Sequence, residues 1–450
     1  MFNLAHGQIT NLVNFSGFST MGKFPEGGLT TDGTYLYGQT SYGGTSGLGS
    51  VYKVLPNGTS FTTIYSFTNT SNDGKYPYGA LYFDGTSFYG MTAGGGANNC
   101  GTIFRILPDG TGYTILYEFA FADGRTPLCD LISDGTYLYG LTSDGGANSG
   151  GTMFRILPNG TGFTKLMDFS ASTTGKWPKG SLYFDGTKLY GTTQQGGAND
   201  DGTIFSVLTD GTGFVDLFDF SNSTTGEWPE CSLISDGTFL YGTTQQGGPG
   251  GSGAIFKIMP DGTQFSVLTS LTGSATGSRV VSDLYYDGIY MYGLASGGGA
   301  GAYGALFRLL PNGTGFVKLA DFNGQLNGRA PRGSLLYVGG SFYSTTAYGG
   351  SYDNGTIFKY TGLVGMQSTF APGQITLYPN PANTSLTVSG CNECDVKLLN
   401  AEGTVVISQS ISGTSNRLDL VGLPSGIYLI QLYIMKPEEE IAVKKIIVTH

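Results

Sequence analysis

The chain has few of the residues on which most catalytic and nucleic-acid-binding sites depend. Among 450 residues there are only two histidines, His6 and His450, and charged residues make up 12%. Two histidines at opposite ends of the chain nearly exclude a Ser-His-Asp or Cys-His catalytic arrangement and a histidine metal site. The formal net charge of −10 argues against nucleic acid as a partner, because phosphate binding needs a basic face.

Long apolar runs are absent as well, and cysteine is scarce. No stretch approaches the ~20 apolar residues of a membrane helix, so no transmembrane segment is expected. The first residues, MFNLAHGQITNL, lack the basic region and the apolar core of a signal peptide. Five cysteines are too few and too irregularly spaced for a disulfide scaffold, and their odd number leaves at least one unpaired.

Glycine and aromatic residues are abundant, and they occur in a repeat. The chain contains 76 Gly, 29 Tyr and 28 Phe, a balance typical of turn-rich β structure. The phrase Asp-Gly-Thr-x-Leu-Tyr-Gly, seen at Asp185, recurs in similar form every 50 to 52 residues. The other copies begin at Asp32, Asp84, Asp134, Asp236 and Asp287, with a degraded seventh at Val338. Such a period predicts a repeat architecture.

Turn signals divide each repeat into four short strands, a to d. Asp-Gly pairs predict tight hairpins between strands a and b and between c and d. Longer glycine-rich loops join b to c, and other loops join d to the next a. Strand c is apolar on both faces, as a sheet between neighbouring sheets requires. Four-stranded antiparallel units repeated radially are the blades of a β-propeller.

The two ends of the repeat region complement each other. The last copy stops after strand c at residues 356–360, and residues 9–16 match the d-strand phrase at 163–170. We therefore predict that the N-terminal strand completes the last blade and removes an exposed edge. The predicted fold is all-β, a seven-bladed propeller over residues 8–361.

The texture of the sequence changes after the repeats. Residues 362–374 break the period and are predicted to be a linker. Residues 375–450 contain about seven short strands rich in Val, Ile and Leu, which predicts a small β-sandwich of immunoglobulin type.

The C-terminal segment resembles the type A sorting domain of cargo proteins of the type IX secretion system. The resemblance rests on the phrase YPNPA at 378–382, LPSGIYL at 423–429 and KKIIV at 444–448. It implies export across the outer membrane and the secretion translocon as a partner. The protein is thus expected to be secreted or on the cell surface, although no signal peptide is visible. A late-assigned start or a mature form would account for that.

The repeats resemble the GloVer tandem repeats of choice-of-anchor bacterial surface proteins. They share the cadence LYG-T--GG----G-IF----DG-G, seen at 189–213. The resemblance implies surface display and brings no biochemical activity.

The connection from strand d to the next strand a carries the candidate ligand-binding residues. It contains Gly-x-aromatic-Pro in four repeats, with the aromatic residues Phe24, Tyr76, Trp177 and Trp228. The same slot holds Thr126, Arg279 and Ala330 in repeats three, six and seven. Aromatic faces can stack on sugar rings. The basic residues beside the slot can bind carboxylates or sulfates, and they are Lys23, Lys75, Arg125 and Lys176. Recurrence favours a packing role between blades, with proline setting the corner, while the small residues leave room for a site.

Carboxylates provide the remaining candidates for chemistry. Asp200 and Asp201 are possible oxygen ligands for a structural calcium ion, but turn preference explains them without a metal, and no cofactor is expected. Glu26, Glu227 and Glu230 would face the long-loop side, where a paired-carboxylate glycosidase needs two acids. No repeat carries a unique acid pair, so solvated surface charges are the simpler interpretation.

Adjacency on one face and the exported context predict a disulfide between Cys100 and Cys129. Cys391 and Cys394 are spaced to close a small hairpin, and Cys231 is expected to be a buried free thiol.

Three functions remain open. The first is an exported binding or adhesion protein whose loop face meets a polysaccharide or a protein. The second is a carbohydrate-active enzyme with paired carboxylates in the propeller funnel. The third is a structural surface element.

Overall fold

The structure is a computed structural model that describes residues 7–449 except 18–19, 69, 71–72, 363–375, 380–381, 390–392, 401–403, 413–414 and 436–437. The described chain is almost entirely β. Its one helix, α1 (Asn222–Thr225), has a single turn, and no described helix has the length and apolarity needed to cross a membrane.

The repeat region forms sheets of one kind. In each of the first six, four antiparallel strands pair in chain order, with the hairpins where the Asp-Gly pairs predict them. Their strands are β2 (Thr30–Thr31), β3 (Leu36–Thr40), β4 (Ser50–Val54), β5 (Thr62–Ser66); β7 (Tyr82–Phe83), β8 (Phe88–Thr92), β10 (Thr102–Ile106), β11 (Thr114–Glu118); β12 (Ile132–Ser133), β13 (Leu138–Thr142), β14 (Thr152–Ile156), β15 (Thr164–Asp168); β16 (Tyr183–Phe184), β17 (Lys188–Thr193), β18 (Thr203–Leu208), β19 (Val215–Asp219); β20 (Ile234–Ser235), β21 (Leu240–Thr244), β22 (Ala254–Ile258), β23 (Ser266–Ser270); and β24 (Tyr285–Tyr286), β25 (Met291–Ala295), β26 (Ala305–Leu309), β27 (Val317–Asp321). A short ladder joins β6 (Gly74–Lys75) to β9 (Gly94–Gly95).

The seventh repeat sheet takes its last strand from the other end of the chain. It consists of β29 (Leu336–Val338), β30 (Ser341–Tyr348) and β31 (Thr356–Thr361), with β28 (Arg329–Pro331) on β30. The strand β1 (Gln8–Asn14) pairs antiparallel with β31. This confirms the predicted pairing of the N-terminal strand with the last repeat.

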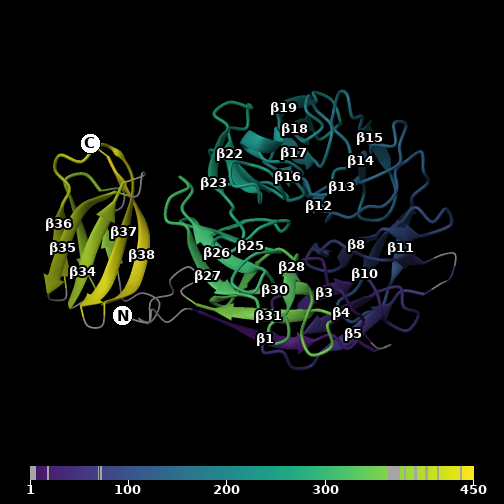
Figure 1. Cartoon of the computed structure of the whole chain (residues 1–450), viewed down its shortest axis with the longest axis horizontal. Helices are drawn as coiled ribbons and strands as arrows, with labels where there is room; N and C mark the ends of the chain where they lie inside the picture. The colour runs from purple at the N-terminus through teal and green to yellow at the C-terminus, as the bar shows by residue number, and fades with distance from the viewer. Residues whose placement is uncertain are drawn as a thin grey trace.

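The sheets follow one another around a common centre, which makes the arrangement propeller-like (Figure 1). The short first strands, such as β12 and β16, lie nearest the centre, and the fourth strands, such as β15 and β19, lie outermost. Residues that enter a sheet therefore meet their counterparts from the other repeats near the centre.

The middle strands are buried on both faces. All five residues of β13 are buried, and in β14 only Arg155 is partly exposed. One core cluster runs from Tyr89 in the second repeat to Val207 in the fourth. The continuous core explains why strand c does not alternate between apolar and polar residues.

The Asp-Gly turn anchors a buried tyrosine in addition to turning the chain. Asp134 Oδ1 accepts the N–H groups of Thr136 and Tyr137, each at 2.7 Å, and Oδ2 accepts the Tyr139 hydroxyl at 2.8 Å. Partial burial alone would raise the pKa of Asp134, but these hydrogen bonds outweigh it and lower the pKa. The same tyrosine bond is present at Asp32, Asp84, Asp185, Asp236 and Asp287. The repeated aspartate and tyrosine therefore form one structural unit.

The C-terminal segment forms two further sheets (yellow in Figure 1). One contains β32 (Thr376–Tyr378), β33 (Ser385–Ser389) and β36 (Ser415–Asp419), and the other β35 (Val405–Ser412), β34 (Glu393–Leu399), β37 (Gly426–Met435) and β38 (Glu438–Val448). Leu386 and Val388 of the first sheet share a core with Val396 and Leu398 of the second. Most of the predicted linker, residues 362–374, lies outside the described residues.

Candidate functional site

A pocket of about 910 Å³ is lined by residues from all seven repeats. Most of the lining comes from the segment that enters each sheet, just after the Gly-x-aromatic-Pro phrase. We call the residue directly after the proline the post-proline residue. The residue two places further along the chain is called the capping residue. Repeat six has Val280 in place of the proline. The post-proline residues are Glu26, Tyr78, Leu128, Lys179, Glu230, Val281 and Arg332, and the capping residues are Gly28, Ala80, Asp130, Ser181, Ser232, Asp283 and Ser334. The post-proline residues differ in every repeat except one and five, so this pocket does not repeat its chemistry.

The capping residues bind one another from repeat to repeat. In each of five repeats the backbone N–H donates to the side-chain oxygen of the capping residue one repeat later. The bonds run from Ala80 to Asp130 (2.6 Å), Asp130 to Ser181 (2.8 Å), Ser181 to Ser232 (2.9 Å), Ser232 to Asp283 (2.6 Å) and Asp283 to Ser334 (3.3 Å). Gly28 and Ala80 have no side-chain oxygen, so the series stops at repeats one and two. These polar groups hold neighbouring sheets together.

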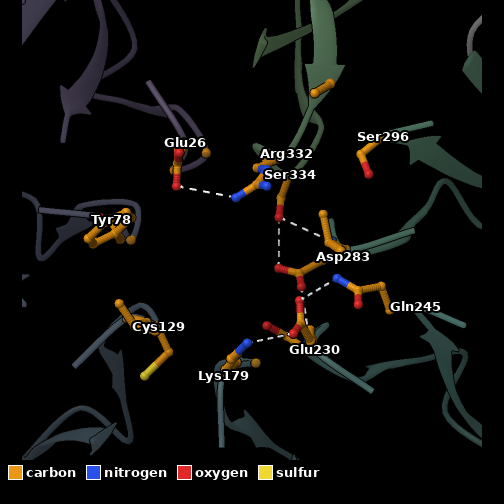
Figure 2. Close-up of a pocket in the computed structure, with 18 of the residues that line it drawn as sticks. Glu26, Tyr78, Cys129, Lys179, Glu230, Gln245, Asp283, Ser296, Arg332 and Ser334 are labelled. Carbon is orange, nitrogen blue, oxygen red and sulfur yellow. Dashed lines mark hydrogen bonds and ion pairs between the residues drawn. The ribbon is translucent and has the colours of Figure 1, made fainter. Parts of the chain in front are cut away.

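Glu230 is surrounded by donors. Its carboxylate accepts hydrogen bonds from Lys179 Nζ at 2.7 Å and Gln245 Nε2 at 3.0 Å (Figure 2). Gln194 Nε2 donates to the same carboxylate at 2.6 Å. Three donors, one of them a cation, thus occupy the carboxylate and fix Glu230 in the wall of the pocket.

The other two predicted acids lie in different surroundings. Glu26 lines the pocket and pairs with Arg332 at 3.5 Å (Figure 2). Burial raises the pKa of Glu26, and Arg332 opposes the shift. Glu227 is not among the lining residues; burial and then the nearby Asp201 raise its pKa. The pocket thus brings together two of the three candidate carboxylates.

Asp130 was not singled out from the sequence, although it faces the pocket. Burial, followed by repulsion from Asp283, raises its pKa to about 6, against the hydrogen bonds from the Ala80 N–H and Ser181. The sequence does distinguish Asp130, because only repeats three and six have an acid as the capping residue.

The aromatic slot is a joint between repeats. Its residue has a positive φ in all seven copies, between 52° and 60°. In each repeat its N–H donates to a carbonyl of the preceding repeat, as from Trp177 to Gly150 at 2.7 Å. The following proline packs on a loop glycine, as Pro178 does on Gly151. The packing interpretation therefore accounts for the backbone of the slot.

The side chains in the aromatic slot differ in whether they line the pocket. Tyr76, Thr126, Arg279 and Ala330 line the pocket, whereas Phe24, Trp177 and Trp228 are not among its lining residues. Trp177 is 37% exposed. Lys176 Nζ lies 4.8 Å from the Trp177 ring centroid and 3.3 Å from Asp200.

Two further tyrosines extend the aromatic slot into an arc that sequence reasoning missed. Phe24 contacts Tyr348 and Tyr42, with centroids 5.1 and 6.0 Å apart, and Tyr42 contacts Tyr76 at 4.9 Å. All four rings are half-buried. We call Tyr348, Phe24, Tyr42 and Tyr76 the aromatic arc. The sequence does mark Tyr42 and Tyr348: each directly precedes the Gly-Gly pair of the loop after the second strand, and only repeats one and seven carry a tyrosine there.

The remaining predicted site residues have structural surroundings. Asp200 accepts the Gly196 N–H at 2.9 Å and Asp201 accepts the Asn222 N–H at 2.8 Å. The Asp200 bond lies within its own loop, as the turn interpretation expects, whereas the Asp201 bond joins this loop to the start of α1, 21 residues away.

The predicted disulfide between Cys100 and Cys129 is wrong. Both are buried free thiols, and their sulfurs have different partners: Cys129 Sγ donates to the Leu141 carbonyl at 3.3 Å and Cys100 Sγ to the Asn98 carbonyl at 3.4 Å. Cys231 is a buried free thiol, as expected. Cys391 and the side chain of Cys394 lie outside the described residues, so that pair stays a prediction.

Comparison with solved structures supports the fold. PorZ, a surface component of the type IX secretion system of Porphyromonas gingivalis, matches with a TM-score of 0.50 and 14% identity over 95% of this chain and 60% of that one. The extracellular domain of the putative one-component system BT4673 from B. thetaiotaomicron matches with a TM-score of 0.51 and 12% identity, over 98% and 57%. The chain thus spans about 60% of the length of these two proteins. An oligogalacturonate lyase in complex with manganese matches with a TM-score of 0.50 and 14% identity, over 79% and 93%.

Family comparisons cover nearly the whole chain. No curated protein matches its sequence significantly. Residues 376–449 match the secretion system C-terminal sorting domain, which indicates a secreted or cell-surface protein. Residues 1–141, 131–294 and 240–376 match the Gloeobacter/Verrucomicrobia repeat. The chain belongs to the Gloeobacter/Verrucomicrobia repeat family and carries a type IX secretion sorting domain at its C-terminal end.

Proposed function

We propose that the repeat sheets are the blades of a closed seven-bladed propeller over residues 8–361. The junction between the last and first repeats supports this. Phe24 N–H donates to the Asn354 carbonyl at 2.8 Å, and Pro25 packs on Gly355. The same contacts join the successive repeats elsewhere, for example Trp177 to Gly150.

The C-terminal unit, over residues 375–450, acts as the export signal. Its two sheets with a common core are compatible with an immunoglobulin-type sandwich. Its partner is the type IX secretion translocon, as the matching sorting domain suggests. The repeat region is then the part that works outside the cell.

The exported propeller binds a glycan at the aromatic arc and the adjoining pocket. The observation that carries this proposal is the arc itself: four half-buried rings in successive contact, with Tyr76 also lining the pocket. Aromatic rings beside an open pocket with convergent polar groups are typical of ligand sites. A sugar chain, with apolar ring faces and polar edges, matches both surfaces.

Glycan cleavage is the second candidate function. Asp130 favours it, because a carboxyl whose pKa is raised to about 6 can exist as the acid near neutral pH. The donors around Glu230 and the pairing of Glu26 with Arg332 weigh against it. Binding without turnover is therefore the favoured function.

The chain itself supplies the substitutions that test the binding site. Repeats three and seven hold Thr126 and Ala330 in the aromatic slot with the same positive φ. Tyr76→Thr and Phe24→Ala should thus be tolerated by the fold. Each should weaken glycan binding about tenfold, the effect of losing roughly 1.4 kcal/mol of ring contact.

The assay is a glycan array followed by calorimetric titration of the best ligand. Phe121→Ala is the control, since this ring is 45% exposed and is not among the lining residues of the pocket. Binding of no glycan on the array would reject the proposal and leave a protein partner or a structural element. Equal glycan affinity of the wild type and the two arc variants would show that the glycan binds outside the aromatic arc. Turnover lost in Asp130→Asn would establish the enzyme instead.

A further inference from the structure

Resting on the proposed glycan-binding function, we infer that the ligand is an anionic saccharide whose carboxylate or sulfate is bound by Arg279. Three observations support this: the pocket carboxylates already have partners, the Arg279 guanidinium pairs with no acid among the described residues, and an exposed tyrosine lies in the same lining.

The carboxylates that line the pocket are occupied. Glu230 accepts Lys179 and two glutamines, and Glu26 pairs with Arg332. Asp283 accepts the Ser232 N–H at 2.6 Å and the Ser334 hydroxyl at 2.9 Å. Asp130 accepts the Ala80 N–H at 2.6 Å. A cationic ligand would have to compete with these donors.

Arg279 differs from the other described cations that line the pocket, which are Lys179, Arg329 and Arg332. Each of those three pairs with an acid within 3.5 Å: Lys179 with Glu230, Arg329 with Asp353 and Arg332 with Glu26. No described acid pairs with the guanidinium of Arg279. Its positive charge is therefore available to a ligand.

The backbone holds Arg279 firmly in place. It occupies the aromatic slot of repeat six, with φ of 56°. Its N–H donates to the Ser252 carbonyl at 3.1 Å, and its own carbonyl accepts the Ser296 N–H at 3.0 Å and the Ser296 hydroxyl at 2.7 Å. A guanidinium on such a fixed backbone loses less conformational freedom when it binds an anion. Its planar fork matches a carboxylate or a sulfate with two hydrogen bonds.

The surroundings of Arg279 fit a charged sugar better than a bare anion. Tyr303, which is 41% exposed, lines the same pocket and comes from the long loop of the same repeat. The ring supplies an apolar face for the sugar, while Arg279 supplies the charge. The net charge of −10 repels polyanions at long range, so recognition of an anionic chain requires this local cation.

The test uses three probes on the full chain: an oligomer of galacturonic acid, a sulfated galactose oligomer and the neutral galactose oligomer. We expect one of the anionic probes to bind at least about tenfold more tightly than the neutral one. Arg279→Gln should weaken that binding about 10- to 100-fold, the range for a lost charge-assisted hydrogen-bond pair. Arg279→Lys should restore part of it, because lysine keeps the charge without the fork.

Lys318→Gln is the control that removes one positive charge elsewhere: Lys318 pairs with Asp321 at 2.9 Å and is not among the lining residues of the pocket, so the affinity of this variant for the probes should stay unchanged. Preference for the carboxylated or the sulfated probe identifies the anion. Equal affinity for the neutral probe, or wild-type affinity in Arg279→Gln, would overturn the inference while leaving the proposed glycan-binding function in place. Failure of all three probes overturns it too, and the glycan array then decides whether the binding function also fails.

Discussion

Replacing Phe15 by alanine tests whether the N-terminal strand closes the ring of repeats. Phe15 is fully buried directly after β1, with ring centroids 5.2 Å from Tyr52 and 5.8 Å from Phe61 in the first repeat. Its N–H donates to the Gly355 carbonyl of the last repeat at 3.1 Å. One residue thus joins both ends of the repeat region, and Phe15→Ala should cost about 3–5 kcal/mol, as other buried Phe→Ala changes do.

The second repeat supplies the control, Phe119, whose ring packs against the third repeat. Phe119 is equally buried, lies 5.2 Å from Phe154, and donates its N–H to the Gly101 carbonyl at 3.0 Å. Because the two environments match, the free energies of unfolding of Phe15→Ala and Phe119→Ala should agree within about 1 kcal/mol. Urea unfolding can be followed by the fluorescence of Trp177 and Trp228, which lie in distant repeats and report loss at Phe15 only if the ring unfolds as one unit.

A loss below about 1 kcal/mol for Phe15→Ala, with the full loss for Phe119→Ala, would refute closure by the N-terminal strand. It would mean that β31 keeps an open edge in solution. Equal large losses would support a single cooperative ring.

Three further outcomes follow from the buried polar groups. Tyr52 has a buried hydroxyl without a hydrogen-bond partner in the described chain, and the other repeats carry Phe at the equivalent position. Tyr52→Phe should therefore raise the free energy of unfolding, measured in urea, by about 1 kcal/mol. A lower free energy of unfolding would show that the hydroxyl has a hydrogen-bond partner. The native protein keeps a proton on Asp130 up to about pH 6 while the unfolded chain releases it near pH 3.8, so stability should fall as pH rises through that window. Asp130→Asn, which retains an oxygen for the Ala80 N–H, should remove the fall and add about 1–2 kcal/mol at pH 7, and an unchanged pH profile would contradict the shift. Burial raises the pKa of Cys129 to about 12, so this thiol should resist alkylation in the folded protein. After unfolding it should react without any reductant, which peptide mass spectrometry would detect. If alkylation required a reductant, Cys129 would be in a disulfide.

The strands and turns were largely predictable because they depend on local chemistry. An Asp-Gly pair favours the same tight turn wherever it occurs, and each Asp also binds the tyrosine five residues later, as Asp134 binds Tyr139. The match between residues 9–16 and the fourth-strand phrase predicted the pairing of β1 with β31. Periodicity carries such information because equivalent residues meet equivalent neighbours.

The candidate site was less predictable because its contacts join different repeats. Glu230 was chosen from the sequence as an acid, but Lys179, Gln194 and Gln245 reach it from 51, 36 and 15 residues away. The aromatic arc also depends on a contact between opposite ends of the repeat region, Phe24 with Tyr348. No local pattern indicates such partners.

The cysteines illustrate the same limit. The sequence suggested a disulfide because Cys100 and Cys129 were expected on one face, but a disulfide also requires the two sulfurs to approach each other. The Leu141 carbonyl of the same repeat accepts the Cys129 thiol, and the Asn98 carbonyl accepts the Cys100 thiol, so the two sulfurs have different partners.

The sequence by itself determined the repeat, the strands of each sheet, the pairing of its two ends and the export signal. These features follow from turn chemistry, hydrophobic pattern and short family phrases, all of which act over a few residues. Only the tertiary structure decided which residues face the pocket and which charges have no ion-pair partner among the described residues, as with Arg279. Burial and ion pairing depend on distances in space, and these exist only once the sheets are arranged around their common centre (Figure 1).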